Sequence, residues 1–239
     1  MKALLQVTGL SKRYGGVIAL DGVDLSIGDG GVHAVIGPNG AGKSTLVNLI
    51  CGRQKPDRGS IRFQGADITN WQPHRRIRQG IGYTFQITSI FGAFTCRRNI
   101  EIAAGHGPQV STRVDQVLRD LGLDGLAEVQ ADTLAYGHQR LLEIGMGLVQ
   151  SPRLLILDEP TQGLSDAEIA IFNDLVRRVA ADRTVLLIEH NMAVVMALAS
   201  RITVLNDGRL LADGAPGAIR ADERVQRAYL GTGIRNAGT

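Results

Sequence analysis

The chain has 239 residues, of which 44% are hydrophobic and 21% charged, a balance that suits one large α/β domain and excludes a disordered protein. Its formal net charge of +3 has two interpretations, ordinary solubility or attraction to a membrane face. The sequence has no run of basic residues interleaved with aromatic residues, so nothing in it indicates a nucleic-acid surface. The two cysteines, Cys51 and Cys96, have neither disulfide-framework nor metal-site spacing, so we expect buried, reduced thiols.

The first third of the chain predicts short strands. Residues 4–10 and 17–27 alternate apolar and polar side chains, as half-exposed antiparallel strands do. Residues 31–37 are a continuous apolar run, followed by a glycine loop and a helical pattern at 44–52. Two further strands are expected at 60–65 and 80–86, on either side of a basic stretch at 74–80.

The pattern becomes helical in the middle of the chain. Residues 112–123 and 138–150 have apolar side chains at helical spacing, and strand signals are absent from about 88 to 150. We interpret 88–150 as a helical lobe inserted into the α/β core.

Alternation of strands and helices resumes after this lobe. The expected elements are strands at 153–159 and 184–190, helices at 165–181 and 192–200, and a hairpin at 201–214 that turns at Asp207-Gly208. The uncharged apolar run at 192–200 is far shorter than the ~20 residues that a membrane span needs.

Three of the expected strands lead directly into polar residues. The continuous apolar runs at 31–37, 153–159 and 184–190 are typical of parallel strands covered on both faces. They end in a glycine loop, a carboxylate pair and a Glu-His pair. Because ligands bind at the carboxyl ends of strands in open α/β sheets, we expect one sheet edge to collect all this chemistry.

The glycine loop satisfies the phosphate-binding pattern G-x-x-x-x-G-K-[ST] between a strand and a helix. Glycine lets backbone N–H groups turn inward toward phosphate oxygens, and the helix dipole favours the same anion. Lys43 is expected to reach the terminal phosphates, and the Ser44 hydroxyl to bind Mg²⁺. The candidate nucleotide-binding residues here are Gly37, Pro38, Asn39, Gly40, Ala41, Gly42, Lys43, Ser44 and Thr45.

The carboxylate pair, Asp158 and Glu159, follows the strand at 153–159. Acidic residues at a strand end are common, so the pair gains meaning only from the phosphate loop. Next to a phosphate loop, Asp158 is predicted to bind Mg²⁺, and Glu159 is predicted to act as the general base that polarises the attacking water.

This set of motifs resembles the ATP-binding subunit of ABC transporters. Residues 37–45 match the Walker A loop of that family, 154–158 match Walker B, and Glu159 stands at the place of the catalytic glutamate. The resemblance covers about residues 4 to 231 in the right order.

The resemblance extends to four further residues. It implies that Gln86 is the Q-loop glutamine, which senses Mg²⁺ and couples to the membrane domain, and that Asp166 ends the D-loop GLSD (163–166). His190 matches the switch histidine that contacts the γ-phosphate, and Tyr14 matches the aromatic residue on which adenine stacks.

The fold implied by the resemblance is α/β, with a P-loop NTPase (RecA-like) core, an N-terminal antiparallel β subdomain and an inserted α-helical subdomain. The whole chain, 1–239, is then a single ABC ATPase domain. Residues 1–87 and 151–239 form its nucleotide-binding core, and 88–150 form the helical subdomain that carries the signature loop.

The run LAYGHQR (134–140) resembles the ABC signature L-S-G-G-Q, with Ala135, Tyr136 and His138 as replacements and Gly137 retained. In the family this loop binds the γ-phosphate held by the opposite subunit, so Ala135 and Gly137 are candidate nucleotide-binding residues. The missing serine hydroxyl is worth about 1.5–3 kcal/mol to a charged ligand. The expectation is a weakened site on the partner subunit, which favours a heterodimer; the alternative is that alanine is tolerated and both sites turn over.

Several stretches resemble the ATPases of branched-chain amino-acid uptake systems and their urea or amide relatives: YTFQ, the Tyr136-Gly137 signature followed by QRLLEIG, IEHNM and RVQRAYLG. The resemblance implies an ATP- and Mg²⁺-dependent importer ATPase on the inner face of the cell membrane. Its implied partners are a second ATPase subunit, transmembrane permeases and, indirectly, an extracytoplasmic solute-binding protein.

Two other classes of function compete with this prediction. A non-transport ABC ATPase of DNA repair or translation generally carries two ATPase domains or long coiled-coil insertions, and 239 residues hold neither. A small GTPase usually shows the guanine-reading N-K-x-D, which is absent, and a P-loop kinase needs a second substrate pocket.

Overall fold

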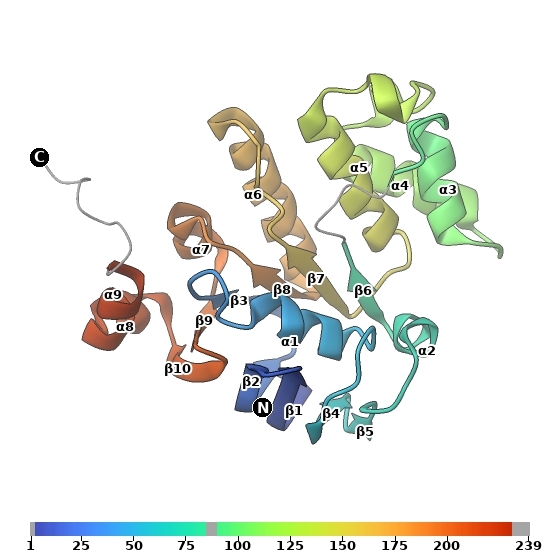
Figure 1. Ribbon diagram of the computed structural model, residues 1–239. Helices are drawn as coiled ribbons and strands as arrows, with labels where there is room; N and C mark the ends of the chain where they lie inside the picture. The colour runs from blue at the N-terminus through green and yellow to red at the C-terminus, as the bar shows by residue number, and fades with distance from the viewer. Residues whose placement is uncertain (1–2, 85–89, 231–239) are drawn as a thin grey trace, which may run out of the picture.

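The computed structural model describes residues 3–84 and 90–230 and has an α/β architecture (Figure 1). In this part of the chain the strands form two sheets, the first of which is antiparallel in the order β2-β1-β4-β5. Its strands are β1 (Ala3–Tyr14), β2 (Val17–Gly28), β4 (Arg58–Phe63) and β5 (Ala66–Asp67). The predicted antiparallel strands at 4–10 and 17–27 are confirmed, and each is longer than its alternating pattern.

The second sheet has the order β10-β9-β3-β8-β7-β6 among the described residues. Its strands are β3 (Gly31–Ile36), β6 (Ile81–Tyr83), β7 (Leu154–Asp158), β8 (Thr184–Ile188), β9 (Arg201–Asn206) and β10 (Arg209–Gly214). All neighbours pair in parallel except β9 and β10. Since β3, β8 and β7 are adjacent and parallel, the three predicted strands end at one edge.

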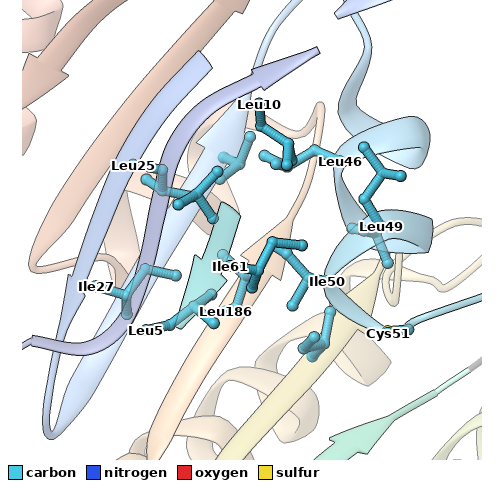
Figure 2. Close-up of a cluster of buried hydrophobic side chains, with 14 of the residues drawn as sticks. Leu5, Leu10, Leu25, Ile27, Leu46, Leu49, Ile50, Cys51, Ile61 and Leu186 are labelled. Atoms are coloured by element: carbon cyan, nitrogen blue, oxygen red, sulfur yellow. The ribbon is translucent and has the colours of Figure 1, made fainter. Parts of the chain in front are cut away.

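Both faces of the parallel sheet are covered, which explains why its central strands are apolar throughout. In β7, Leu154 and Ile156 face one buried cluster, and Leu155 and Leu157 face another, as the two-residue period of a strand requires. The first cluster joins the two sheets across α1 (Lys43–Ile50), where Leu5 and Ile61 of the antiparallel sheet meet Leu49, Ile50 and Leu186 (Figure 2).

The described helices include all those predicted. The patterns at 112–123, 138–150, 165–181 and 192–200 correspond to α4 (Val110–Asp120), α5 (Tyr136–Leu148), α6 (Asp166–Asp182) and α7 (Met192–Leu198). The structure adds α2 (Pro73–Arg78), α3 (Cys96–Ala104), α8 (Pro216–Ala221), α9 (Glu223–Leu230) and the short 3₁₀ turns η1 (Asp124–Leu126) and η2 (Ala131–Thr133). No helix within residues 3–84 and 90–230 is long and apolar enough to cross a bilayer.

Helix α2 was not predicted because only one large apolar residue, Ile77, interrupts its basic run. The helix is instead fixed by Pro73 at its start and by Arg76, whose buried guanidinium donates to the carbonyls of Leu49 and Ile50 at the end of α1. A contact of this kind depends on the tertiary structure and leaves no period in the sequence.

The predicted turn at Asp207-Gly208 is confirmed. Both residues have positive φ, 47° and 72°, as a two-residue hairpin turn of this type requires. Both cysteines are buried and free, also as predicted.

A buried histidine links β3 to the outer strands of the sheet. The Nε2 atom of His33 lies 2.8 Å from Oγ1 of Thr203, which itself donates to Asp213 at 2.9 Å. Because the Thr203 hydroxyl already donates, it accepts from His33, which places a proton on Nε2. Burial lowers the pKa of His33 to about 4, against a raising effect of Asp213 and a lowering effect of Arg201.

This lowered pKa predicts a loss of stability in acid. Between pH 6.5 and 4 the unfolded chain protonates His33 and the folded chain does not, so the free energy of unfolding falls as pH falls through that window. The contribution of this residue reaches about 3 kcal/mol. We expect His33→Gln to flatten the pH dependence of chemical denaturation between pH 6.5 and 4, whereas His74→Gln, on the exposed face of α2, leaves it unchanged. Equal slopes in all three proteins would contradict the assignment.

Candidate functional site

The turn between β3 and α1 has two positions where a side chain does not fit. A Cβ on Gly37 would lie 2.2 Å from the carbonyl oxygen of Leu205, and one on Gly42 would lie 2.5 Å from that of Ala19. Gly42 also has a φ of 100° and is the N-cap of α1 without a side-chain acceptor. The first N–H groups of α1 therefore lack the usual cap, and an anion such as phosphate can take its place.

Lys43 lies across this turn with only 6% of its surface exposed. Its Nζ atom donates to the carbonyls of Gly37 at 2.8 Å and Pro38 at 3.0 Å. Burial lowers the pKa of Lys43, and the carboxylates of Glu159 and Asp158 oppose that shift. The ammonium group is thus held over the loop by acceptors that a phosphate can replace, while Ser44 next to it is exposed.

Asp158 ends β7 and is 3% exposed. Its Oδ2 accepts from the hydroxyl of Tyr83 at 3.2 Å, whereas Oδ1 is buried without a hydrogen-bond partner in the described structure. Burial raises the pKa of Asp158. A hard cation would compensate this buried oxygen, so the position fits Mg²⁺, which binds few carboxylates and keeps other oxygen ligands. Within residues 3–84 and 90–230 no three His, Cys, Asp or Glu side chains form a metal cluster of their own.

Glu159 and His190 come together at the same edge. Nδ1 of His190 lies 4.0 Å from Oε1 of Glu159, and the Glu159 side chain is 18% exposed. Glu159 has a φ of 46°, a conformation that costs a non-glycine residue about 1–3 kcal/mol. Its N–H donates to Ile188 at the end of β8, which helps to hold this conformation.

A buried ion pair that was not predicted contacts the backbone of the turn at Glu159. Arg140 and Glu143, one helical turn apart in α5, are each 3% exposed and paired. Arg140 also donates to the backbone carbonyls of Asp158, Glu159 and Pro160 at 3.0 to 3.3 Å. The only signal in the sequence is a pair of opposite charges three residues apart in an apolar helix, which a surface pair also gives.

A second brace joins the ends of β7 and β8. The side chain of Glu189 is fully buried and accepts from the N–H and hydroxyl of Thr161 and from the N–H groups of His190 and Asn191. Because four donors satisfy this carboxylate, we interpret Glu189 as a structural group that fixes the backbone at His190 and Asn191 relative to Thr161.

The signature residues lie elsewhere, against the start of α6. Ala135 is the N-cap of α5 and makes no side-chain cap bond. The hydroxyl of Tyr136 donates to the carbonyl of Gln162 at 3.3 Å, and its ring covers Gly163. A Cβ on Gly137 would lie 2.0 Å from the carboxylate of Glu168.

Glu168 joins the two helix starts. Its carboxylate forms a capping box with Ser165, next to Asp166 at the first position of α6, and lies directly against Gly137 in the first turn of α5. These bonds lower the pKa of Glu168, the Ser165 hydroxyl most strongly. The predicted signature loop and the predicted D-loop are therefore in contact within this chain.

The residue predicted to stack on adenine belongs to the antiparallel sheet. Tyr14 lies at the end of β1 with 42% of its surface exposed, and its hydroxyl is bonded to the side chain of Gln54. Nζ of Lys12 lies 5.7 Å from the centroid of the Tyr14 ring, and stacking of adenine on this ring stays a prediction. Gln86 lies outside the described residues.

Comparison with known families gives two matches. Residues 20–162 match the model described as ABC transporter. Residues 209–234 match that of the branched-chain amino acid ATP-binding cassette transporter.

Curated relatives match along nearly the whole chain. The chain is 37% identical to the high-affinity branched-chain amino acid transport ATP-binding protein BraF of Pseudomonas aeruginosa, covering 96% of this chain and 98% of the relative. It is 36% identical to the high-affinity branched-chain amino acid transport ATP-binding protein LivG of Escherichia coli K12, covering 95% of this chain and 98% of the relative. Among solved structures, the ATP-binding cassette MJ1267 superposes with a TM-score of 0.89 at 29% identity, covering 96% of this chain and 99% of that one. These likenesses confirm the predicted fold class.

Proposed function

The chain belongs to the ABC transporter family and is an ATPase subunit, and from this premise we propose that it energises the uptake of branched-chain amino acids. The observation that carries the proposal is the edge where the Gly37–Gly42 turn, Lys43, Asp158, Glu159 and His190 come together. The C-terminal match at 209–234 and the names of the relatives support the solute class.

The proposed chemistry assigns one role to each group at this edge. Lys43 exchanges its two carbonyl acceptors for the terminal phosphates of ATP, and Glu159 takes the proton of the attacking water. His190, 4.0 Å from Glu159, donates to the γ-phosphate. Ser44 and Asp158 would hold Mg²⁺, which neutralises charge that develops on the phosphates.

A partner ATPase is proposed because the signature loop and the phosphate loop of this chain contact different elements. The signature residues lie against the start of α6, whereas the phosphate loop lies against β2 and β9. In a head-to-tail dimer each nucleotide is enclosed by one phosphate loop and the signature loop of the partner subunit, and closure of this interface on ATP drives the transport cycle.

A permease is the proposed second partner. A groove of about 600 Å³ between α2, α3 and α5 is lined mostly by apolar residues, of which Ile77, Phe91 and Ile102 are 46%, 47% and 38% exposed, together with the charged side chains of Arg53, Arg76 and Glu143. An exposed apolar groove of this kind fits an amphipathic segment of a membrane subunit. It would place the chain at the inner face of the membrane.

The test is solute uptake into proteoliposomes that hold the permease subunits, with this chain, its partner ATPase and ATP enclosed in the lumen and the solute and its binding protein outside. Uptake of leucine that requires ATP, Mg²⁺ and this chain is the expected result, with labelled urea as the control solute. ATP-dependent transport of urea without leucine would overturn the solute class and leave the ATPase assignment standing.

The replaced signature serine makes a separate prediction. Ala135→Ser supplies a side-chain cap for α5 and a hydroxyl that can donate to the phosphate bound by the partner subunit. We expect the ATPase rate to rise several-fold, because one hydrogen bond to a charged group is worth roughly a factor of 10 or more. Ala215→Ser is the matched control, since Ala215 is the equally uncapped N-cap of α8. A rate unchanged by Ala135→Ser would mean that the backbone of Gly137 suffices.

A further inference from the structure

The first residue of the phosphate loop, Gly37, contacts the last described helix of the chain, α9 (Glu223–Leu230). The N–H of Gly37 donates to the hydroxyl of Tyr229 at 3.0 Å, and the same hydroxyl lies 3.4 Å from the Gly37 carbonyl oxygen. The two residues are 192 positions apart. A phenol hydroxyl accepts and donates at once, so Tyr229 can satisfy both polar groups of this one residue.

Apolar side chains pack helix α9 against the parallel sheet next to the contact between Tyr229 and Gly37. Val225 and Tyr229, one turn apart on the same face of α9, pack on a buried cluster that includes Ile36, the last residue of β3. Val195 of α7 and Val204 of β9 belong to the same cluster. In Figure 1, α8 and α9 form the side of the molecule next to α7 and β10. The hydroxyl of Tyr229 is therefore positioned by packing rather than by its hydrogen bonds alone.

Gly37 is held from three directions. The carbonyl oxygen of Leu205 leaves no room for a Cβ on one side, and the Tyr229 hydroxyl binds the backbone N–H. The Gly37 carbonyl accepts from Lys43 at 2.8 Å. Gly37 is the first residue of the loop, so its backbone sets the direction in which the following N–H groups point.

The same geometry supplies a replacement donor when a nucleotide binds. Lys43 must turn toward the phosphates, and its bond to the Gly37 carbonyl is then weakened or shared. Gly37 is buried, and a buried carbonyl without a donor costs about 1–3 kcal/mol. The Tyr229 hydroxyl is the group in place to donate to it.

We propose that Tyr229 is a positioning residue for nucleotide phosphate, which acts by holding the Gly37 backbone of the phosphate loop. The C-terminal helix α9 is thereby part of the nucleotide site, although it touches no nucleotide itself. This inference rests on the proposed function of the phosphate loop.

The test compares Tyr229→Phe with the parent protein in the full chain. The substitution keeps the ring and its packing and removes only the hydroxyl. We expect the KM for ATP and the Kd for ADP to rise about 3- to 10-fold, the effect of one hydrogen bond, with kcat changed less than twofold and the melting temperature lowered by a few degrees, about 2–4 °C for each kcal/mol of lost stability. Gln226→Ala, also on α9, is the matched control, because it removes a side-chain hydrogen bond to the backbone carbonyl of Arg220 in α8 and should leave the KM for ATP unchanged.

Binding of adenosine separates positioning from general loosening. If Tyr229 acts through the phosphate loop, the affinity for adenosine stays the same while that for ADP falls. Equal losses for both ligands, or an ADP affinity equal to that of the parent, would overturn the inference. A parent protein that binds no ATP would overturn the proposed function as well, whereas an active parent with an identical Tyr229→Phe variant would remove only the role of Tyr229.

Discussion

Glu159→Gln is expected to lower kcat for ATP hydrolysis by about 10²- to 10⁴-fold, the usual contribution of a general base. Glutamine has nearly the same shape but does not accept the proton of the attacking water. The Arg140 and Ile188 contacts that fix the Glu159 backbone do not involve its side chain, so the turn should persist.

ATP binding should survive this substitution, with a Kd within about threefold of the parent value, because Lys43 and the Gly37–Gly42 turn are intact. The protein should then accumulate as an ATP-bound closed dimer, which gel filtration with and without ATP detects. Glu128→Gln is the matched control, since the Glu128 side chain is 74% exposed and pairs with Arg97 at the surface. Hydrolysis at the parent rate would show that Glu159 is not the base.

Lys43→Met should abolish tight ATP binding and turnover together. A lost hydrogen bond to a charged group weakens binding by about 10- to 150-fold, and loss of the ammonium in the transition state lowers kcat by a further 10²-fold or more. The readouts are the Kd for ATP from equilibrium binding and the steady-state rate.

The stability of the Lys43→Met variant should be equal to that of the parent protein or higher. Burial lowers the pKa of Lys43, so the folded protein holds this charge at a cost, and methionine fills the same space without it. We therefore expect an unchanged or raised melting temperature in the inactive variant. Lys55→Met, at an exposed position after α1, controls for loss of a lysine charge. A large fall in melting temperature would instead make Lys43 a structural residue.

Local sequence patterns determined much of this protein because they act through backbone chemistry. Glycines at 37, 40 and 42 followed by Lys43 predict a phosphate loop and the start of α1, since the positive φ angles that these glycines adopt are a local demand of the backbone. Continuous apolar runs predicted β3, β7 and β8, and the end of each run placed Asp158, Glu159 and His190 at one edge.

Tertiary structure alone decided which distant groups meet. The order in which β9, β3, β8 and β7 lie side by side depends on how three apolar clusters fill the faces of the sheet, and strand periodicity is the same in any order. Arg140 reaches Glu159 and Tyr229 reaches Gly37 because close packing brings α5 and α9 to those points. Hydrogen bonds between segments 19 and 192 residues apart depend on angstrom-scale placement of whole elements, for which a single sequence carries no local signal.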